Sequence, residues 1–306
     1  MTKSCDDLPA GVGSADGMAQ PDRAMASTSG PSTGPQAVRP LDFGTRLHNL
    51  LLVVVVLHQF GRWVPVMSMF PTRTKEQLFL LWGASVANAI LVLGMGAWLY
   101  VHFSGSGLGV MWAVLCIPLG LFLADLATGL VHWSTDTWFD GRSWTRTIGV
   151  AREHHIYPQN ILHYGPAEHL AFGSYPALMF LAPIALPIML FSAGGPAAVA
   201  AMIVLTIVCC AMLFGTYAHR LGHVRARSRV VRVLQRCHLL LDIGHHRNHH
   251  CRDHLTHYCV FNGWANVVCD RIGFWRFLEI VIHRVTGAVP RKDDTHWAGE
   301  HRSGRL

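Results

Sequence analysis

Charged side chains are scarce in this 306-residue chain. Only 14% of the residues are Asp, Glu, Lys or Arg, whereas 51% are hydrophobic. A soluble domain usually carries about 25% charged residues, so the composition predicts an integral membrane protein. The formal net charge is +7. A basic chain with a mean hydropathy of +0.30 suits anionic lipid headgroups better than nucleic acid, and we expect no nucleic-acid partner.

Three other features are missing. The eight cysteines include no Cys-x-x-Cys motif, which predicts reduced thiols rather than a disulfide framework. The Gly-x-Gly-x-Gly run at 105–109 joins two apolar segments and follows no strand, so it indicates no nucleotide site. Residues 1–40 lack the apolar stretch of a secretory signal peptide and are rich in Gly, Ser and Pro. We expect a disordered tail there.

Long apolar runs, in contrast, are plentiful. Each of four segments has roughly the 20 apolar residues that a membrane-spanning helix needs. These segments are Leu78–Val101, Leu108–Val131, Leu170–Phe191 and Pro196–Ala218. A shorter apolar run, Leu50–Leu57, is followed by polar residues and a proline. It predicts an interfacial or re-entrant helix, with a further transmembrane helix (residues 48–67) as the alternative.

The distribution of basic residues predicts the orientation in the membrane. The turns at 102–107 and 192–195 contain no Lys or Arg, whereas residues 71–77, 140–153 and the chain after Ala218 contain several. The positive-inside rule therefore places both turns outside and the other segments in the cytoplasm. Within the basic region, Arg225–Leu241 alternates arginines with apolar residues. This pattern favours a helix lying on the membrane surface, and binding of a substrate phosphate is the alternative.

Histidines cluster at four places, all at the predicted cytoplasmic ends of the spans. Residues 245–250 contain four histidines, and helical spacing brings several of them onto one face. A chance histidine-rich surface turn is the alternative for that stretch taken alone. The other clusters are a His and an Asp four residues apart, an adjacent pair, and a further pair four residues apart. The candidate metal ligands and catalytic residues are His132, Asp136, His154, His155, His219, His223, His245, His246, His249 and His250.

The number of candidate donors indicates two metal ions. A structural zinc ion takes about four ligands and an octahedral ion about six. Ten donors are too many for one ion and suit a pair. Asp125, inside the second span, is either a buried polar contact to another helix or part of the site. His163 and His169 are further possible ligands, although loop histidines are the simpler interpretation.

The motifs, in their order and spacing, resemble a known family, the membrane lipid desaturases of the Kua/CarF type. This family includes animal plasmanylethanolamine desaturase and the plant plastid trans-3 palmitate desaturase. The resemblance covers roughly Leu78 to Leu278. The run Pro158–Gly165 departs from the usual family pattern, which bears on the substrate more than on the metal centre. The motifs that carry the resemblance are Gly129–Trp138, Glu153–His155 with Pro158, His219–His223, Leu234–Gln235, His245–His250, Tyr258–Cys259 and Gly263–Asn266.

The resemblance implies a di-iron centre held by histidines and one aspartate, with O2 as co-substrate. It implies formation of the vinyl ether of plasmalogens from a 1-O-alkyl phospholipid, with acyl-chain (trans-3 type) desaturation, hydroxylation and a non-enzymatic metal-binding scaffold as alternatives. Electrons would come from an external donor of the cytochrome b5 or ferredoxin type. The expected architecture is an all-α integral membrane protein with about four transmembrane helices, an interfacial helix and a cytoplasmic His-rich di-metal cap. The domain would span residues 41–285, followed by a polar tail, 286–306.

Overall fold

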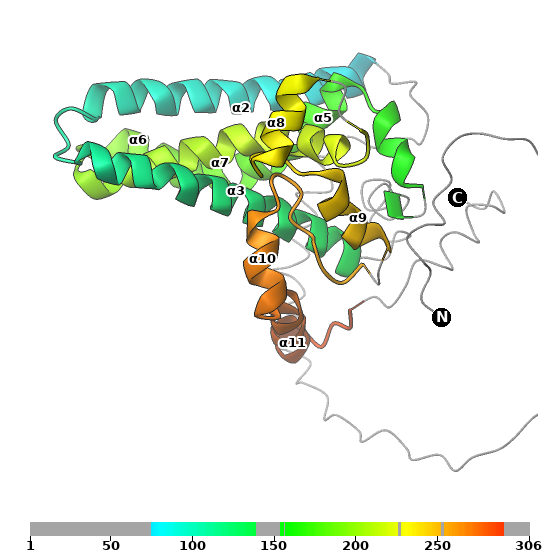
Figure 1. Cartoon of the computed structure of the whole chain (residues 1–306). Helices are drawn as coiled ribbons and strands as arrows, with labels where there is room; N and C mark the ends of the chain where they lie inside the picture. Colours follow the sequence, from blue (N-terminus) through cyan, green and yellow to red (C-terminus); the bar gives the residue numbers. More distant parts are fainter. Residues whose placement is uncertain (1–74, 139–153, 156, 226–227, 252–253, 291–306) are drawn as a thin grey trace, which may run out of the picture.

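The computed structural model describes residues 75–138, 154–155, 157–225, 228–251 and 254–290, and within them every regular element is a helix (Figure 1). The predicted N-terminal tail, the interfacial helix near Leu50–Leu57 and the end of the C-terminal tail lie outside the described residues. The predictions for these segments therefore remain predictions. The all-α membrane architecture is confirmed by the part of the chain that is described.

Four predicted spans are present, each long and apolar enough to cross a bilayer, with mean hydropathies of 1.8 to 2.7. The first, second and fourth are single helices. The third is composite, because a π-helical turn joins two α-helices. The elements are α2 (Lys75–His102), α3 (Val110–Thr137), α5 (Pro166–Pro176), η3 (Ala177–Leu181), α6 (Ala182–Phe191) and α7 (Pro196–Leu221).

Prolines explain why the third span is interrupted. Pro176, Pro183 and Pro187 lack the backbone N–H that an α-helix requires at each position. In η3 the N–H of Ala182 instead reaches the carbonyl of Ala177, five residues back. The span begins at Pro166, earlier than the predicted Leu170, because the polar first turn of α5 continues the apolar helix.

The fourth span is the centre of the bundle, since α7 packs against α2, α3 and α5. Glycines allow the closest crossings. A Cβ built on Gly173 of α5 would lie 1.5 Å from the carbonyl oxygen of Met212 on α7, and one on Gly120 of α3 would lie 2.9 Å from Ile207. Any side chain at position 173 would push α5 away from α7.

The shorter helices gather at the end of the bundle remote from the two membrane turns (Figure 1). Helix α9 lies near the ends of α3 and α7, whereas α8 and α10 run across the bundle axis. The first described residues that follow the second span, 154–155 and 157–163, and those that follow the fourth span therefore lie at the same end of the molecule. These elements are η2 (Pro158–His163), α8 (Arg229–Arg236), α9 (Ile243–Cys251), α10 (Trp264–Arg271) and α11 (Phe274–Thr286).

Candidate metal centre

Five histidines from three parts of the chain form one group of donors. One nitrogen atom from each lies within 4.8 Å of every other. The Nε2 atom of His246 on α9 is 2.8 Å from that of His219 on α7 and 2.8 Å from that of His223. The four-residue spacing brings His219 and His223, and likewise His246 and His250, into the same group of donors. The group consists of His154, His219, His223, His246 and His250.

Three histidines and one carboxylate form a second group. The Oδ2 atom of Asp136 lies 3.2 Å from Nε2 of His132, 3.3 Å from that of His155 and 3.6 Å from that of His249. Asp136 is buried, and it follows His132 by one helical turn of α3. The donor atoms of this group also lie within 4.8 Å of one another. The anionic donor therefore belongs to one group, and the other consists of neutral imidazoles.

The two adjacent histidine pairs connect the groups. His154 and His250 belong to the five-histidine group, while their neighbours His155 and His249 belong to the aspartate group. The rings of His155 and His250 are 5.5 Å apart, and those of His154 and His155 are 6.3 Å apart. Each doublet thus contributes one donor to each group, which places the groups side by side, as a dinuclear centre requires.

Backbone carbonyls of one loop orient two ligands of the aspartate group. Nδ1 of His249 lies 2.6 Å from the carbonyl oxygen of Thr256, and Nδ1 of His132 lies 2.9 Å from that of Tyr258. A neutral imidazole that donates its Nδ1–H to a carbonyl has its lone pair on Nε2. This arrangement directs Nε2 toward the centre, as outer hydrogen bonds commonly do for histidine ligands.

Asp125 holds the continuation of that loop against α3. Its Oδ1 accepts the backbone N–H groups of Phe261, Asn262 and Gly263 at 2.9–3.1 Å, and its Oδ2 accepts that of Ala265 at 2.9 Å. Asp125 is fully buried. Of the two roles predicted for this residue, the structure supports the buried polar contact, because its carboxylate bonds to the loop and lies outside both donor groups.

The donor set fits metal ions better than it fits a network of hydrogen bonds. A neutral imidazole has only one N–H, so five Nε2 atoms directed at one another cannot all be satisfied mutually, whereas a cation accepts all five lone pairs. Burial lowers the pKa of His154, His246 and His250 well below the usual range. It also lowers the pKa of His223 to about 3 and that of His249 to about 4. These histidines are therefore neutral, as metal binding would require.

One predicted ligand lies apart from both groups. His245 occupies another face of α9, where its Nε2 accepts a hydrogen bond of 2.9 Å from the side chain of Asn266. Helical spacing alone could not separate it from its neighbours, because His245 and His249 are also four residues apart. His163 and His169 are likewise outside both groups. His163 ends η2, and His169 is buried on α5 between Tyr164 and Tyr217 rather than in a loop.

Two supporting residues have only weak signals in the sequence. The ring of His254 stacks on that of the ligand His155, with centroids 4.3 Å apart. Tyr258 packs its ring 5.2 Å from that of His249 and 5.9 Å from that of His132. For His254, the only indication in the sequence is its position four residues after His250. Tyr258 has none beyond its place in a family motif.

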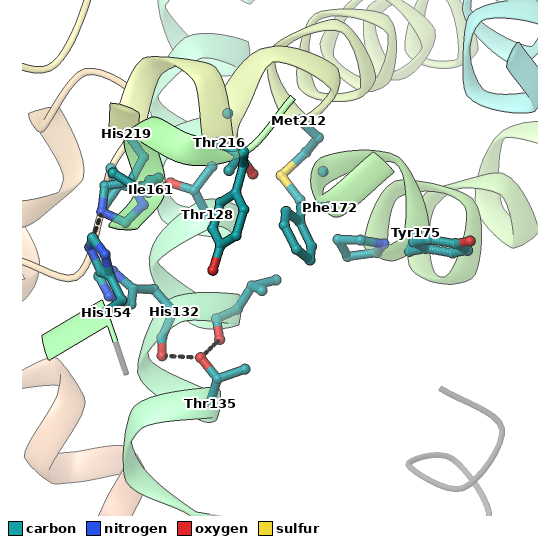
Figure 2. Close-up of a pocket in the computed structure, with 16 residues that line it drawn as sticks. Thr128, His132, Thr135, His154, Ile161, Phe172, Tyr175, Met212, Thr216 and His219 are labelled. Carbon is teal, nitrogen blue, oxygen red and sulfur yellow. Dashed lines mark hydrogen bonds between the residues drawn. The ribbon is translucent and has the colours of Figure 1, made fainter. Parts of the chain in front are cut away.

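An apolar pocket of about 170 Å³ leads to the centre between α3, α5 and α7. Figure 2 shows His154 and His219 at one end and Tyr175 at the other, with Phe172 and Met212 between them. A cavity of about 150 Å³ can hold a benzene ring, so the pocket has room for a short stretch of an alkyl chain. Its wall includes ligands from both donor groups, His132 and His154.

Comparisons with known proteins agree with this architecture. The lipid desaturase domain family matches residues 121–293. Plasmanylethanolamine desaturase 1 of Mus musculus is 34% identical over 196 residues, which cover 60% of this chain and 70% of the mouse protein. The plasmanylethanolamine desaturase of Myxococcus xanthus is 29% identical over 219 residues, covering 68% of this chain and 74% of the relative.

A plant relative is more distant. Fatty acid desaturase 4-like 2 (chloroplastic) of Arabidopsis thaliana is 27% identical over 237 residues, which cover 74% of this chain and 79% of the plant protein. No solved structure matches the chain. The family resemblance predicted from the motifs is confirmed, because the family match includes the described residues of both donor groups. The chain belongs to the lipid desaturase domain family.

Proposed function

We propose that the protein is an O2-dependent di-iron desaturase that converts 1-O-alkyl phospholipid (plasmanylethanolamine) into the vinyl ether plasmalogen. One observation carries the proposal: the apolar pocket between the membrane helices ends at His132, His154 and His219. These three ligands come from both donor groups. An alkyl chain that enters the pocket would therefore bring its C–H bonds directly to the metal centre.

The chemistry explains why a redox metal is needed. The hydrogens of an unactivated alkyl chain are not acidic enough for removal by a side-chain base. Two bound irons would let O2 act as the oxidant: with two external electrons and two protons, O2 would take two hydrogens from the chain and leave as two water molecules. Imidazole donors suit iron, among other transition metals. Five histidines would hold one iron, and Asp136 with three histidines would hold the other.

The residues of the chain have the tasks of positioning and of excluding water. Phe172, Met212 and Val131 form apolar walls that hold the alkyl chain. Asp136 and His249 are buried, so water has little access to that side of the centre. The carbonyls of Thr256 and Tyr258 keep two ligand histidines in one tautomer. A fixed chain and fixed ligands favour reaction at a single C–C bond.

The relatives favour an alkyl ether over an acyl chain. Two of the proteins compared above are plasmanylethanolamine desaturases by name, and the mouse protein has a higher identity to this chain than the Arabidopsis fatty acid desaturase. Desaturation of a phospholipid acyl chain is the second candidate, because the plant proteins match over a similar share of the chain. The substrate in either case is a membrane lipid.

The electron donor and the orientation complete the proposal. We infer that the metal centre faces the cytoplasm. The basic residues lie at the same ends of the membrane spans as the metal centre, and basic residues favour the cytoplasmic side. Arg247 is exposed on α9, the helix that provides three of the ligands. A positive surface close to the centre suits an acidic electron carrier, such as a cytochrome b5 or a ferredoxin.

The test is product analysis in a host that makes alkyl phospholipids but no plasmalogens. We expect expression of the chain to produce an acid-labile vinyl ether lipid with two hydrogens fewer than the supplied alkyl lipid, measured by mass spectrometry. The Asp136→Ala variant should produce none. Gly215 lines the pocket, and a Cβ there would lie 3.2 Å from Cγ2 of Thr128 in the pocket wall, so Gly215→Ala should lower kcat/KM roughly 10-fold. Gly96→Ala is the matched control, because a Cβ there meets no atom within 4 Å.

Three other outcomes would indicate a different function. A new double bond in an acyl chain, with no vinyl ether, would reject the first choice in favour of the second. An oxygenated product without a double bond would indicate a hydroxylase. Zinc in place of iron, together with no change in the lipids, would indicate a metal-binding scaffold.

A further inference from the structure

The helical hairpin α10–α11 exposes large apolar side chains although it is not one of the four spans. Phe277 is 60% exposed, Ile280 49% and Val285 53%. Val267 and Ile272, in and just after α10, are also exposed. Exposed apolar surface of this extent normally marks contact with a partner or a membrane.

The hairpin is fixed to the second span near its inner end. A Cβ on Gly129 would lie 2.4 Å from Sγ of Cys259 and 3.0 Å from the ring of Trp275, which is buried in the first turn of α11. Asp125 accepts the N–H of Ala265 at the start of α10. Gly129 is about 28 Å along α3 from Val110 at a rise of about 1.5 Å per residue. Because the hydrocarbon core is about 30 Å thick, the hairpin lies at its edge.

The orientation of the hairpin fits the plane of a membrane. Figure 1 shows α10 running across the bundle axis, with α11 at the end of α10 remote from the bundle and seen nearly end-on. Helix α11 buries Trp275 and Glu279 against the rest of the protein. At about 100° per residue, Val281 and Val285 lie on the side of the helix opposite Arg276 and His283. The exposed apolar edge therefore runs through Phe277, Val281 and Val285, and the exposed Arg284 borders it beside Phe277.

A second helix, at a similar level along the bundle, also exposes apolar side chains next to basic ones. Helix α8 also runs across the bundle axis, on another side of it (Figure 1). Val230 and Val233 are 67% and 55% exposed, while Arg229 and Arg236 occupy an adjacent exposed edge. Basic and apolar side chains in this arrangement suit a lipid interface. Two helices from different parts of the chain thus indicate the same membrane boundary.

We propose that α10–α11 is a half-embedded anchor, with the Phe277–Val281–Val285 edge of α11 inserted among the acyl chains of the leaflet nearest the metal centre. Arg276 and His283 remain in the headgroup region. Trp275 packs against Tyr258, whose ring contacts the ligands His132 and His249. The anchor therefore sets how deep the centre and its pocket lie relative to the lipid chains.

The test is photo-crosslinking of the full-length protein in phospholipid nanodiscs. A benzophenone amino acid is placed singly at Val281 or Val285, at Arg276 or His283, and at Val114, an exposed apolar residue within the α3 span. We expect mass spectrometry to find lipid adducts at Val281, Val285 and Val114, with at least a 5-fold lower yield at Arg276 and His283.

Two results would overturn the proposal. Equal, low lipid labelling at Val281 and His283, with strong labelling at Val114, would show that the edge faces water. Crosslinks from Val281 to a second copy of the chain, in place of lipid, would show that the edge is a subunit interface. Each variant is checked for wild-type iron content, so that a misfolded protein is not scored. All probed positions are exposed. If a variant does not fold, its position is changed to alanine and the benzophenone probe is placed at Phe277 instead.

Discussion

Replacing His246 with glutamine should abolish desaturation, while the same change at the adjacent His245 should leave most of it. His246 is buried, and its Nε2 lies 2.8 Å from those of two other ligands. His245 instead accepts a hydrogen bond from Asn266, and the amide oxygen of a glutamine can replace that acceptor. Loss of an outer contact to a metal site typically costs 10–100-fold. We therefore expect His246→Gln to lose more than about 100-fold in activity.

The two variants are compared by iron content and by product formation in the same membrane preparation. We expect His246→Gln to lose iron from the five-histidine group and His245→Gln to retain the wild-type amount. The pair is closely matched, because the residues are neighbours on α9 and the substitution is the same. Equal loss of iron in both variants would contradict the assignment of His245 to a supporting role, and normal turnover by His246→Gln would contradict the donor groups themselves.

Removing the Asp125 carboxylate should destabilise the protein and empty the metal centre, although Asp125 is not a ligand. In Asp125→Ala four backbone N–H groups, three of them buried, lose their acceptor. Each unsatisfied buried donor costs about 1–3 kcal/mol, so the loss of four acceptors should lower the free energy of unfolding by at least about 4 kcal/mol. The released loop carries the carbonyls of Thr256 and Tyr258 that orient His249 and His132.

The measurements for Asp125 are thermal unfolding in detergent and iron per chain. Asp125→Asn should have an intermediate effect, since an amide keeps one acceptor but turns an N–H toward a backbone donor. Thr206→Ala is the control, because its hydroxyl bonds only to the carbonyl of Met202 in its own helix. An Asp125→Ala protein with the wild-type melting temperature and iron content would show that the loop holds its position without the carboxylate.

The sequence predicted the spans and most of the candidate site for physical reasons that act locally. Hydropathy over about 20 residues identifies a membrane helix, and all four predicted spans are present. Four-residue spacing placed His219 with His223 and His132 with Asp136, because such pairs share a helix face. The adjacent doublets could not be divided between two metals in advance, since only the folded chain shows which ring reaches which group.

What the sequence could not predict depends on contacts between distant segments. The four hydrogen bonds of Asp125 join residues more than 130 positions apart, and no local pattern encodes them. The separate position of His245 follows from the contact of α9 with Asn266. The sequence predicted no role for α11, because the position of this helix depends on how Trp275 packs against Gly129.

The most direct test of the account is the metal content of the purified, catalytically competent protein. Two adjacent donor groups, each with enough ligands for one ion, predict about two iron ions per chain by elemental analysis, with both lost in the His246→Gln, Asp136→Ala double variant. A single zinc ion per chain in a protein that still makes vinyl ether lipid would contradict the account.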